Sequence, residues 1–303
     1  MTTPRGRLAP SPTGVLHLGN ARSFLLAWLD LRSRGGEVVL RIEDLDGPRI
    51  KAGAAAAAVD DLSWLGLDWD EGPLFQRADV QPYQAALEKL QHLGLVYRCR
   101  CSRKDVEDAA SAPHETIDGR VYPGTCRNCK VGADETHCWR FGFAAEWRCD
   151  FTDRFRGPQS FMAASELGDF VVWKRDGEPA YQLAVVVDDA RQCINEVVRA
   201  DDLLASTARQ IALYRALKLT PPGFAHLPLV VGEDGRRLAK RHGDTTLRFF
   251  RGQGMKPEQL VGLLAHWSGL NPQQHQISAA ELLEDFSLER VSQQQPVWSG
   301  QVR

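Results

Sequence analysis

The first third of the chain alternates strand and helix signals, and this order restricts the fold more than any other feature. The strands are short runs of apolar and β-branched residues, and the helices show apolar residues at helical spacing. The predicted elements are strands near Arg7–Ala9 and at Glu37–Glu43, and helices at Gly19–Ser33, through the alanine-rich stretch to Leu65, and at Asp79–Leu93. A strand–helix–strand–helix order is typical of a parallel sheet covered by helices, so the chain is predicted to be an α/β protein.

The middle of the chain differs from this pattern. From Cys99 to Cys149 the sequence is polar and shows little periodicity, which predicts an insertion rather than a layer of the sheet. Regular structure returns after it, where the Asp176–Gly177 turn lies between two apolar runs. That arrangement predicts a β-hairpin and places Tyr181 on a strand.

The last third predicts a second set of regular elements. Residues 194–219 predict a strand and then a long helix, which Asp201 or Asp202 would cap. Residues 226–247 predict a hairpin-like piece that ends in a basic loop. A further helix is predicted near Pro257–Trp267, and a polar tail follows it.

Composition limits the class of protein. The chain has 303 residues, of which 43% are hydrophobic and 25% charged, as in globular proteins with one large or two ordinary domains. No apolar run reaches the length of a membrane span, and the N-terminus lacks an apolar signal-peptide core, so a cytoplasmic protein is expected. The net charge of −2 gives no overall positive field, so any RNA contact must come from local basic patches.

The stretch RLAPSPTGVLHLGN places a histidine and a glycine where the first strand passes into a helix. It contains neither the glycine pattern of dinucleotide-binding turns nor that of the P-loop. Backbone N–H groups at a helix start can hold an anion, so His17 could bond a phosphate oxygen while Gly19 lets a flat ring approach the backbone. Taken alone, the fragment favours a simpler alternative, a turn with a surface histidine.

A second stretch, EDGRRLAKRHGD, gathers arginine and lysine side chains between Arg236 and Arg241. Like charges on a loop repel one another unless an anion neutralises them. A mobile Lys240 would suit the negative charge that builds on phosphorus during a group transfer. Taken alone, this stretch favours a solvated basic loop.

The two stretches together, in this order, resemble the HIGH and KMSKS signatures of class I aminoacyl-tRNA synthetases. HLGN corresponds to the first and RLAKR to the second, with Ala239 in place of the central serine and Arg241 after the lysine. The segments RLAPSPTGVLHLGNARSFL, LRIEDLD, VVRADDLL and GRRLAKRHG are similar to the glutamyl and glutaminyl branch of that class. The resemblance extends to about residue 270. It implies a Rossmann-like parallel-sheet catalytic domain of class I synthetase type.

The C-terminal part is short for that branch. Only about sixty residues follow Asp244, too few for the large anticodon-binding part of a glutamyl-tRNA synthetase. The chain therefore resembles the glutamyl-queuosine tRNA(Asp) synthetase family, a truncated paralogue. That resemblance implies ATP-dependent activation of L-glutamate and transfer of the glutamyl group to queuosine at the wobble position of tRNA(Asp). Two alternatives stay open: a truncated glutamyl-tRNA synthetase that charges a tRNA 3′ end, and a zinc-bearing RNA-binding paralogue without catalysis.

Seven cysteines in a chain without an export signal indicate free thiols or metal ligands rather than a disulfide framework. Cys99-x-Cys101 and Cys126-x-x-Cys129 have the spacing of a four-thiolate zinc site. The family resemblance implies another fourth ligand, because its C-x-C and Y-x-x-x-C pattern matches Cys99, Cys101, Tyr122 and Cys126. Cys129 stays the alternative. In either form, one structural Zn²⁺ would hold an insertion that has little apolar material of its own.

The resemblance also implies which residues bind glutamate and ATP. Arg7 and Arg199 suit the substrate carboxylates, since a guanidinium fork can bond both oxygens, and Glu43 offers a negative charge to the α-ammonium group. The glutamate-binding set is Arg7, Leu8, Ala9, Pro10, Ser11, Glu43, Tyr181 and Arg199. The ATP-binding set is His17, Gly19, Asn20 and Lys240, of which His17 and Lys240 are the implied catalytic residues.

The implied partners are ATP with Mg²⁺ on its triphosphate, L-glutamate, and tRNA(Asp) that bears queuosine. A monomer is expected, with no membrane partner. The implied organisation is a catalytic domain in two parts, residues 1–98 and 150–219, with a zinc-binding insertion at 99–149. Residues 220–303 would form the signature loop and a small helical C-terminal part, without an anticodon-binding domain.

Overall fold

The computed structural model describes residues 2–45, 47–102, 104–106, 115–116, 119–238 and 244–300. The chain divides into two compact units, each built from separate stretches of sequence. The first unit comprises Met1–Phe75, Ile194–Asp201 and Gly223–Arg303, and the second comprises Gln76–Cys193 and Asp202–Pro222. The predicted insertion at residues 99–149 lies wholly within the second unit.

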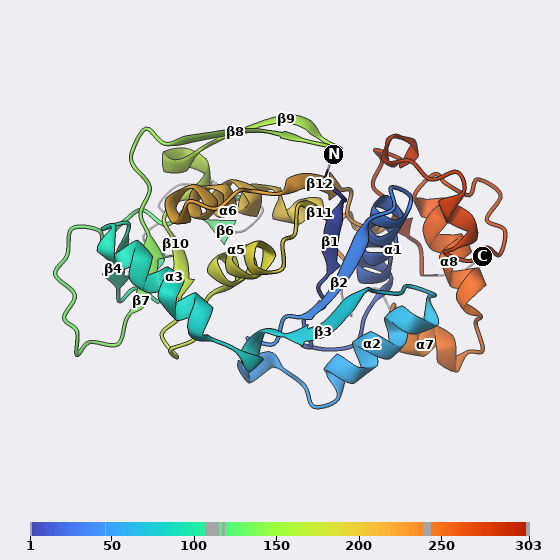
Figure 1. The fold of residues 1–303 in the computed structure, drawn as a ribbon, viewed down its shortest axis with the longest axis horizontal. Coiled ribbons are helices and arrows are strands. Elements are labelled where there is room, and N and C mark those ends of the chain that lie inside the picture. The colour runs from blue at the N-terminus through green and yellow to red at the C-terminus, as the bar shows by residue number, and fades with distance from the viewer. Residues whose placement is uncertain are drawn as a thin grey trace. The chain divides into compact units, whose positions relative to one another are not determined.

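Parallel strands form the centre of the first unit (Figure 1). β1 (Arg5–Leu8), β2 (Glu37–Ile42) and β3 (Glu71–Phe75) pair in that order, and each pair is parallel. β11 (Glu196–Ala200) pairs in parallel with β12 (Gly223–Leu227). β1 and β2 are buried along nearly their whole length, as expected where both faces of a parallel sheet are covered. The two strands predicted in this part of the sequence are confirmed.

β11 lies directly beside β1. The backbone N–H of Asn195 donates to the Arg5 carbonyl at 2.9 Å, and the Asn195 side chain accepts from the N–H of Arg5 at 2.7 Å. One residue further along both strands, a Cβ atom added to Gly6 would come within 2.9 Å of the Glu196 carbonyl oxygen. One residue forward in β1, from Arg5 to Gly6, thus corresponds to one residue forward on the other segment, from Asn195 to Glu196. β11 therefore runs in the same direction as β1. The chain therefore passes from β1 to β2 on one side and later returns to β11 on the other.

The helices of the first unit include α1 (Leu18–Arg32), α2 (Ala54–Trp64), α7 (Leu247–Gly252) and α8 (Pro257–Trp267). The predicted counterparts of α1, α2 and α8 are confirmed. α1 is largely buried, and its Arg22 side chain donates to Ser268 Oγ at 2.9 Å and to the Pro228 carbonyl at 2.6 Å. The predicted polar tail contains a short strand, β14 (Val297–Trp298), which pairs in parallel with β13 (Val231–Gly232).

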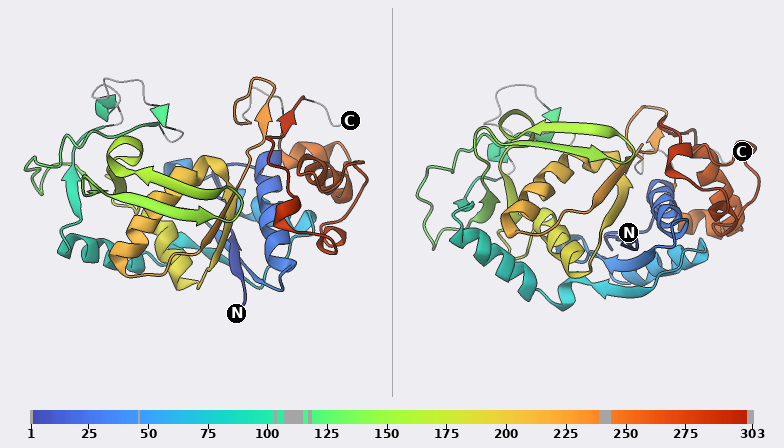
Figure 2. Two further views of the ribbon diagram at one scale, coloured as in Figure 1. Left: turned by 90° about the horizontal axis from the view of Figure 1, so that it is seen from above. Right: turned by 45° about the horizontal axis from the view of Figure 1, so that its top comes forward.

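The second unit contains a small antiparallel sheet in the order β10–β7–β4. Its strands are β4 (Val96–Cys99), β7 (Cys138–Phe141) and β10 (Phe170–Trp173). A separate hairpin, β8 (Arg148–Asp153) with β9 (Gly157–Met162), is the long light-green ribbon in Figure 2. The unit also contains α3 (Gln81–His92), α5 (Tyr181–Arg191), α6 (Leu204–Leu217) and the short strands β5 (Glu115–Thr116) and β6 (Gly119–Arg120). Across the described residues, no helix has both the length and the apolar character needed to cross a membrane.

The predicted strand at Tyr181 is wrong, because this residue begins the helix α5. Trp173 and Pro179 form only an isolated antiparallel bridge after β10, so the Asp176–Gly177 turn does not lead into a second full strand. α5 is buried continuously from Leu183 to Asp189. A helix buried on most sides shows a continuous apolar run, and its valines resemble those of a buried strand.

Two other predictions are also wrong. The segment from Cys99 to Cys149 contributes β7, the central strand of an antiparallel sheet, which is too short for its alternation to stand out in the sequence. α6 has no side-chain cap, since a 3₁₀ turn at Asp201–Leu203 precedes it. The Asp201 carboxylate instead accepts from the backbone N–H of Leu229 at 3.2 Å.

The close approach of β11 to β1 makes Gly6 a test of the fold. Gly6→Ala should lower the free energy of unfolding by roughly 1–3 kcal/mol, because its methyl group would lie 2.6 Å from Leu31 Cδ1 and 2.9 Å from the Glu196 carbonyl oxygen. Gly252→Ala is the control, since nothing lies within 4 Å of its added methyl group. Urea unfolding of both variants measures the difference. Equal stabilities would contradict the packing described for β1.

Candidate functional site

His17 caps the N-terminus of α1. Its Nδ1 atom accepts from the backbone N–H groups of Gly19 and Asn20 at 3.1 and 3.3 Å. The side-chain oxygen of Asn20 accepts in return from the backbone N–H of His17 at 3.4 Å. These bonds satisfy N–H groups that a helix start leaves without intrahelical partners. They give a physical reason for a histidine and an asparagine at this junction.

The imidazole of His17 is held as a neutral hydrogen-bond donor. A Cβ atom on Gly19 would lie 3.0 Å from His17 Cε1, so the flat ring that the glycine admits in this structure is the imidazole itself. Because Nδ1 accepts two N–H groups, the proton of the neutral ring belongs on Nε2, which can donate to a ligand. The pKa of His17 is lowered to about 4, first by burial and then by the charge of Arg237.

Both flanks of the predicted basic loop meet the segment that contains His17. Two backbone hydrogen bonds of 2.9 Å, one in each direction, join residues 16–18 to residues 245–247. On the other flank, Arg237 is close enough to lower the pKa of His17. The predicted catalytic lysine and its neighbours lie outside the described residues; these are Ala239, Lys240 and Arg241.

Two buried arginines lie on neighbouring strands of the first unit. Arg7 is in β1 and Arg199 in β11, and their exposed fractions are 7% and 6%. Arg199 Nε donates to Nε2 of His226 at 3.0 Å, and its guanidinium group lies 5.5 Å from the ring centre of Phe224. Both arginines stand near the carboxyl ends of their strands, where ligands bind in open α/β sheets. His226 was not predicted, since a lone histidine on a short strand carries no sequence signal.

The loop after β1 lies beside Glu43, another predicted glutamate ligand. Of the predicted loop residues, Leu8 and Pro10 are buried, Ala9 is half-buried and Ser11 is exposed. The Pro10 carbonyl accepts from the backbone N–H of Glu43 at 3.1 Å. The Glu43 carboxylate lies 3.4 Å from Nη2 of the fully buried Arg41. Tyr181 belongs to the second unit, where its side chain is 40% exposed.

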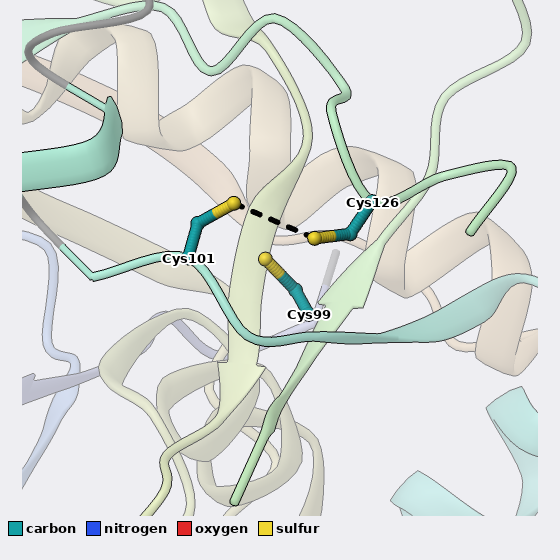
Figure 3. Close-up of side chains that lie close together, drawn as sticks. All are labelled: Cys99, Cys101 and Cys126. Atoms are coloured by element: carbon teal, nitrogen blue, oxygen red, sulfur yellow. Dashed lines mark hydrogen bonds between the residues drawn. The ribbon is translucent and has the colours of Figure 1, made fainter. Parts of the chain in front are cut away.

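Three cysteines of the second unit form one cluster (Figure 3). The Sγ atoms of Cys99, Cys101 and Cys126 all lie within 4.8 Å of one another, and those of Cys101 and Cys126 are 3.4 Å apart. The Tyr122 hydroxyl lies 3.4 Å from Cys99 Sγ and 3.6 Å from Cys101 Sγ. It also accepts from the backbone N–H of Cys126 at 2.8 Å. The four predicted residues are thus brought together.

Cys129, the alternative fourth ligand, stands apart from this cluster. Its side chain is exposed, and its thiol donates to the Thr125 carbonyl at 3.2 Å. Its sulfur is not among those that gather within 4.8 Å of one another. The geometry therefore favours Tyr122 over Cys129 as the neighbour of the three thiols.

The surroundings of Cys99 favour its thiolate form. The pKa of Cys99 lies far below its ordinary value, because hydrogen bonds from the side chains of Cys138, Tyr122 and Arg140 outweigh the effect of burial. Arg140 Nε donates to the Cys99 sulfur at 3.2 Å. Burial, followed by the hydrogen bond to Cys99, raises the pKa of Tyr122. Since a metal binds the thiolate form of cysteine, Cys99 is prepared for such a role.

The protein class follows from a comparison with family models. Residues 4–301 match the model of tRNA synthetases class I (E and Q), catalytic domain. The chain belongs to this family. The α/β fold and the ligase class implied by the resemblance are thereby confirmed.

The synthetase is similar to curated relatives along most of its length. The glutamyl-Q tRNA(Asp) synthetase of Rhodopirellula baltica is 48% identical over 95% of this chain and 90% of its own length. That of Symbiobacterium thermophilum is 48% identical over 94% of this chain and 93% of its own. The glutamate–tRNA ligase of Citrifermentans bemidjiense is 38% identical over 99% of this chain and 64% of its own length. The resemblance to glutamyl-queuosine tRNA(Asp) synthetases is confirmed.

A solved structure gives the same result for the fold of the synthetase. The crystal structure of a glutamate tRNA ligase from Elizabethkingia meningosepticum, in complex with its amino acid, superimposes with a TM-score of 0.81. The match has 26% sequence identity and covers 99% of this chain and 68% of the ligase chain.

Acid titration of the synthetase should reveal the buried His17. Its folded-state pKa of about 4 lies below the ordinary value of 6.5, so the unfolded chain takes up the proton first and stability falls as the pH drops between these values. His17 should account for a loss of roughly 2–3 kcal/mol by about pH 4.5. His17→Asn keeps a good helix cap without a titrating group. Urea unfolding at about pH 7 and pH 4.5 should therefore show a smaller acid loss in the variant; identical losses would refute the assignment.

Proposed function

We propose that this synthetase activates L-glutamate with ATP and transfers the glutamyl group to queuosine at the wobble position of tRNA(Asp). Its identity of 44–48% with glutamyl-Q tRNA(Asp) synthetases from four organisms carries this assignment. The glutamate–tRNA ligase of Citrifermentans bemidjiense is less similar, at 38%. The acceptor named for the more similar relatives is therefore preferred over a tRNA 3′ end. A cytoplasmic location is part of the same proposal.

The nucleotide would bind at the N-terminus of α1, beside what we propose is a Rossmann-like parallel sheet. The start of a helix favours phosphate, because its N–H groups and dipole both present positive charge. His17 adds an Nε2–H donor there, Asn20 and Gly19 shape the first turn, and Lys240 would supply a positive charge. Lys240 follows Arg237 by three positions in the sequence, so the chain is long enough for it to approach His17.

Glutamate would bind near the carboxyl ends of β1 and β11. Arg7 and Arg199 are rigid, buried cations that suit its carboxylates, and bidentate contacts would fix its orientation. Glu43 would face the α-ammonium group, with residues 8–11 as the neighbouring wall. Tyr181 would add a hydroxyl donor, a role that the family resemblance implies.

In the first step, an oxygen of the glutamate α-carboxylate attacks the α-phosphorus of ATP, and pyrophosphate leaves. The protein's contribution is to hold two anions together and to neutralise charge as it builds on phosphorus. Lys240 would act chiefly in that transition state, with Mg²⁺ accompanying the triphosphate. In the second step, a nucleophilic group of the queuosine base attacks the glutamyl carbonyl, and AMP leaves.

The cysteine cluster fits one structural Zn²⁺. Tetrahedral zinc with bonds of about 2.3 Å places neighbouring sulfur atoms about 3.8 Å apart. The separations in the cluster, 3.4 Å for one pair and below 4.8 Å for all, bracket this value. Cys99, Cys101 and Cys126 would supply three thiolates, and Tyr122 would complete the set through its phenolate oxygen. When bound, the ion would cross-link β4 to the loop that carries Tyr122 and Cys126.

Two assays with one preparation test the proposed reaction. ATP–pyrophosphate exchange with glutamate, with and without tRNA, reports activation. Labelled glutamate offered to tRNA(Asp) with queuosine, to the same tRNA without it, and to tRNA(Glu) reports the acceptor. We expect label only on the queuosine-bearing tRNA(Asp). Label at the 3′ end of tRNA(Glu) would overturn the acceptor, and the absence of exchange under every condition would favour the non-catalytic paralogue.

Lys240→Ala should lower kcat for pyrophosphate exchange by about 10²–10³-fold and raise the KM for ATP much less, because the charge acts on the transition state. Arg248→Ala, which removes an exposed cation from α7, is the matched control and should leave both constants close to those of the unchanged protein. An increase in KM alone would assign Lys240 to ground-state binding.

Metal analysis separates the two candidate fourth ligands. The purified protein should hold one zinc ion per chain, and Cys129→Ser should retain it with unchanged affinity, because Cys129 lies outside the cluster. Tyr122→Phe should weaken zinc binding by about tenfold or more, since it removes a ligand. Elemental analysis and competition with a chelator measure both quantities. The reverse pattern would make Cys129 the ligand.

A further inference from the structure

The Arg140 side chain makes three contacts, two of them with the cysteine cluster and its neighbour Tyr122. Nε donates to Cys99 Sγ at 3.2 Å, and Nη1 donates to the Asp169 carbonyl oxygen at 3.1 Å. The guanidinium carbon lies 3.9 Å from the centre of the Tyr122 ring. The residue sits on the central strand β7 and is only 9% exposed. Hydrogen bonds therefore hold the edge of the guanidinium group, and the Tyr122 ring packs against its flat face.

The register of the sheet explains why this arginine reaches the cluster. Cys138 pairs with Cys99, and two residues further on Arg140 pairs with Tyr97. Side chains of opposed residues, and of residues two apart, lie on the same face of an antiparallel sheet. Arg140 and Cys99 consequently share one face, whereas Arg98 stands on the other and stacks over Trp139 at 5.2 Å.

The polar partners of Arg140 differ from those usual for a buried arginine. Among the residues that the structure describes, no carboxylate lies within ion-pair distance of it, and its polar partners are a sulfur atom and a carbonyl oxygen. A buried cation is costly unless a negative charge accompanies it. Three thiolates and one phenolate would bring four negative charges to a dication, leaving two in excess. The completed metal centre is thus the group that would balance Arg140.

We propose that Arg140 is a positioning residue of the metal centre, which offsets the excess negative charge of its ligands and holds Cys99 and Tyr122 in place for zinc. This inference rests on the zinc site proposed above. An N–H donor to a thiolate and a cation on the face of an electron-rich ring both strengthen as those ligands become negative. Outer residues that bond metal ligands typically change metal affinity by about 10–100-fold.

Zinc competition against a chelator tests this role on the full-length protein. Arg140→Met keeps a long side chain but removes the charge, and should weaken zinc binding by at least about tenfold. Arg140→Lys keeps the charge, and should recover part of that loss. Arg98→Met is the matched control, because it removes an arginine–aromatic contact from the opposite face of the same sheet; it should leave zinc affinity unchanged. Thermal unfolding of each zinc-free variant reports folding separately.

A double-mutant cycle with Tyr122→Phe distinguishes charge balance from packing. Without the phenolate the site carries one excess negative charge instead of two, so Arg140→Met should cost less affinity in that background than in the unchanged protein. Equal losses in both backgrounds, or no recovery with lysine, would overturn the proposed role. If the unchanged protein binds no zinc, the metal site fails together with the inference; if it binds zinc and Arg140→Met binds equally well, only the inference fails.

Discussion

The contact between residues 16–18 and residues 245–247 is the constraint on which the proposed nucleotide site depends. Its two backbone hydrogen bonds contribute only about 1 kcal/mol each. Leu16, Leu18 and Leu247, all at most 5% exposed, contribute more, at roughly 1.5–3 kcal/mol for each buried side chain. Apolar burial therefore fixes this junction whether or not a nucleotide is bound. The described residues that follow the basic loop are consequently held next to the helix start that the loop would serve.

The proposed site in the first unit combines a neutral imidazole with two guanidinium groups. At the start of α1, burial lowers the pKa of His17 and keeps the imidazole neutral. The neutral ring can donate one hydrogen bond to the proposed phosphate. At the ends of β1 and β11, Arg7 and Arg199 are more deeply buried than His17, and each guanidinium fork can bond both oxygens of one carboxylate. The proposed roles, a neutral donor for the nucleotide and guanidinium groups for the amino acid, thus follow from the chemistry of the side chains.

Local patterns in the sequence were sufficient for β1, β2, α1, α2 and α8 of the first unit, because the periodicity of these elements extends over their length, but they did not indicate β3, α7 or β14. They were insufficient for α5, whose buried valines resemble a strand, and for β7, which has only four residues. The placement of β11 beside β1 depends on Asn195 and Gly6, which are far apart in sequence and carry no signal of their own. At the site, motifs indicated His17 and the cysteines, but the orientation of the imidazole came from a cap that involves Asn20. Arg140 and His226 could not be predicted, since each acts through a strand register that only the folded chain defines.

The proposed metal centre illustrates the same dependence on register, and the core around it is small. The buried residues around the cluster are Cys99, Tyr122, Cys126, Val131 and Cys138, so three of its five members are cysteines. Methylene burial of about 0.8 kcal/mol per group can give such a small core only a few kcal/mol, whereas a structural zinc site can contribute about 10–16 kcal/mol. With zinc bound, the ligands rather than apolar packing would therefore determine the conformation of the loop from Tyr122 to Val131. Arg140 belongs to the sheet and not to that loop, so the position of its charge depends on the strand register rather than on the loop.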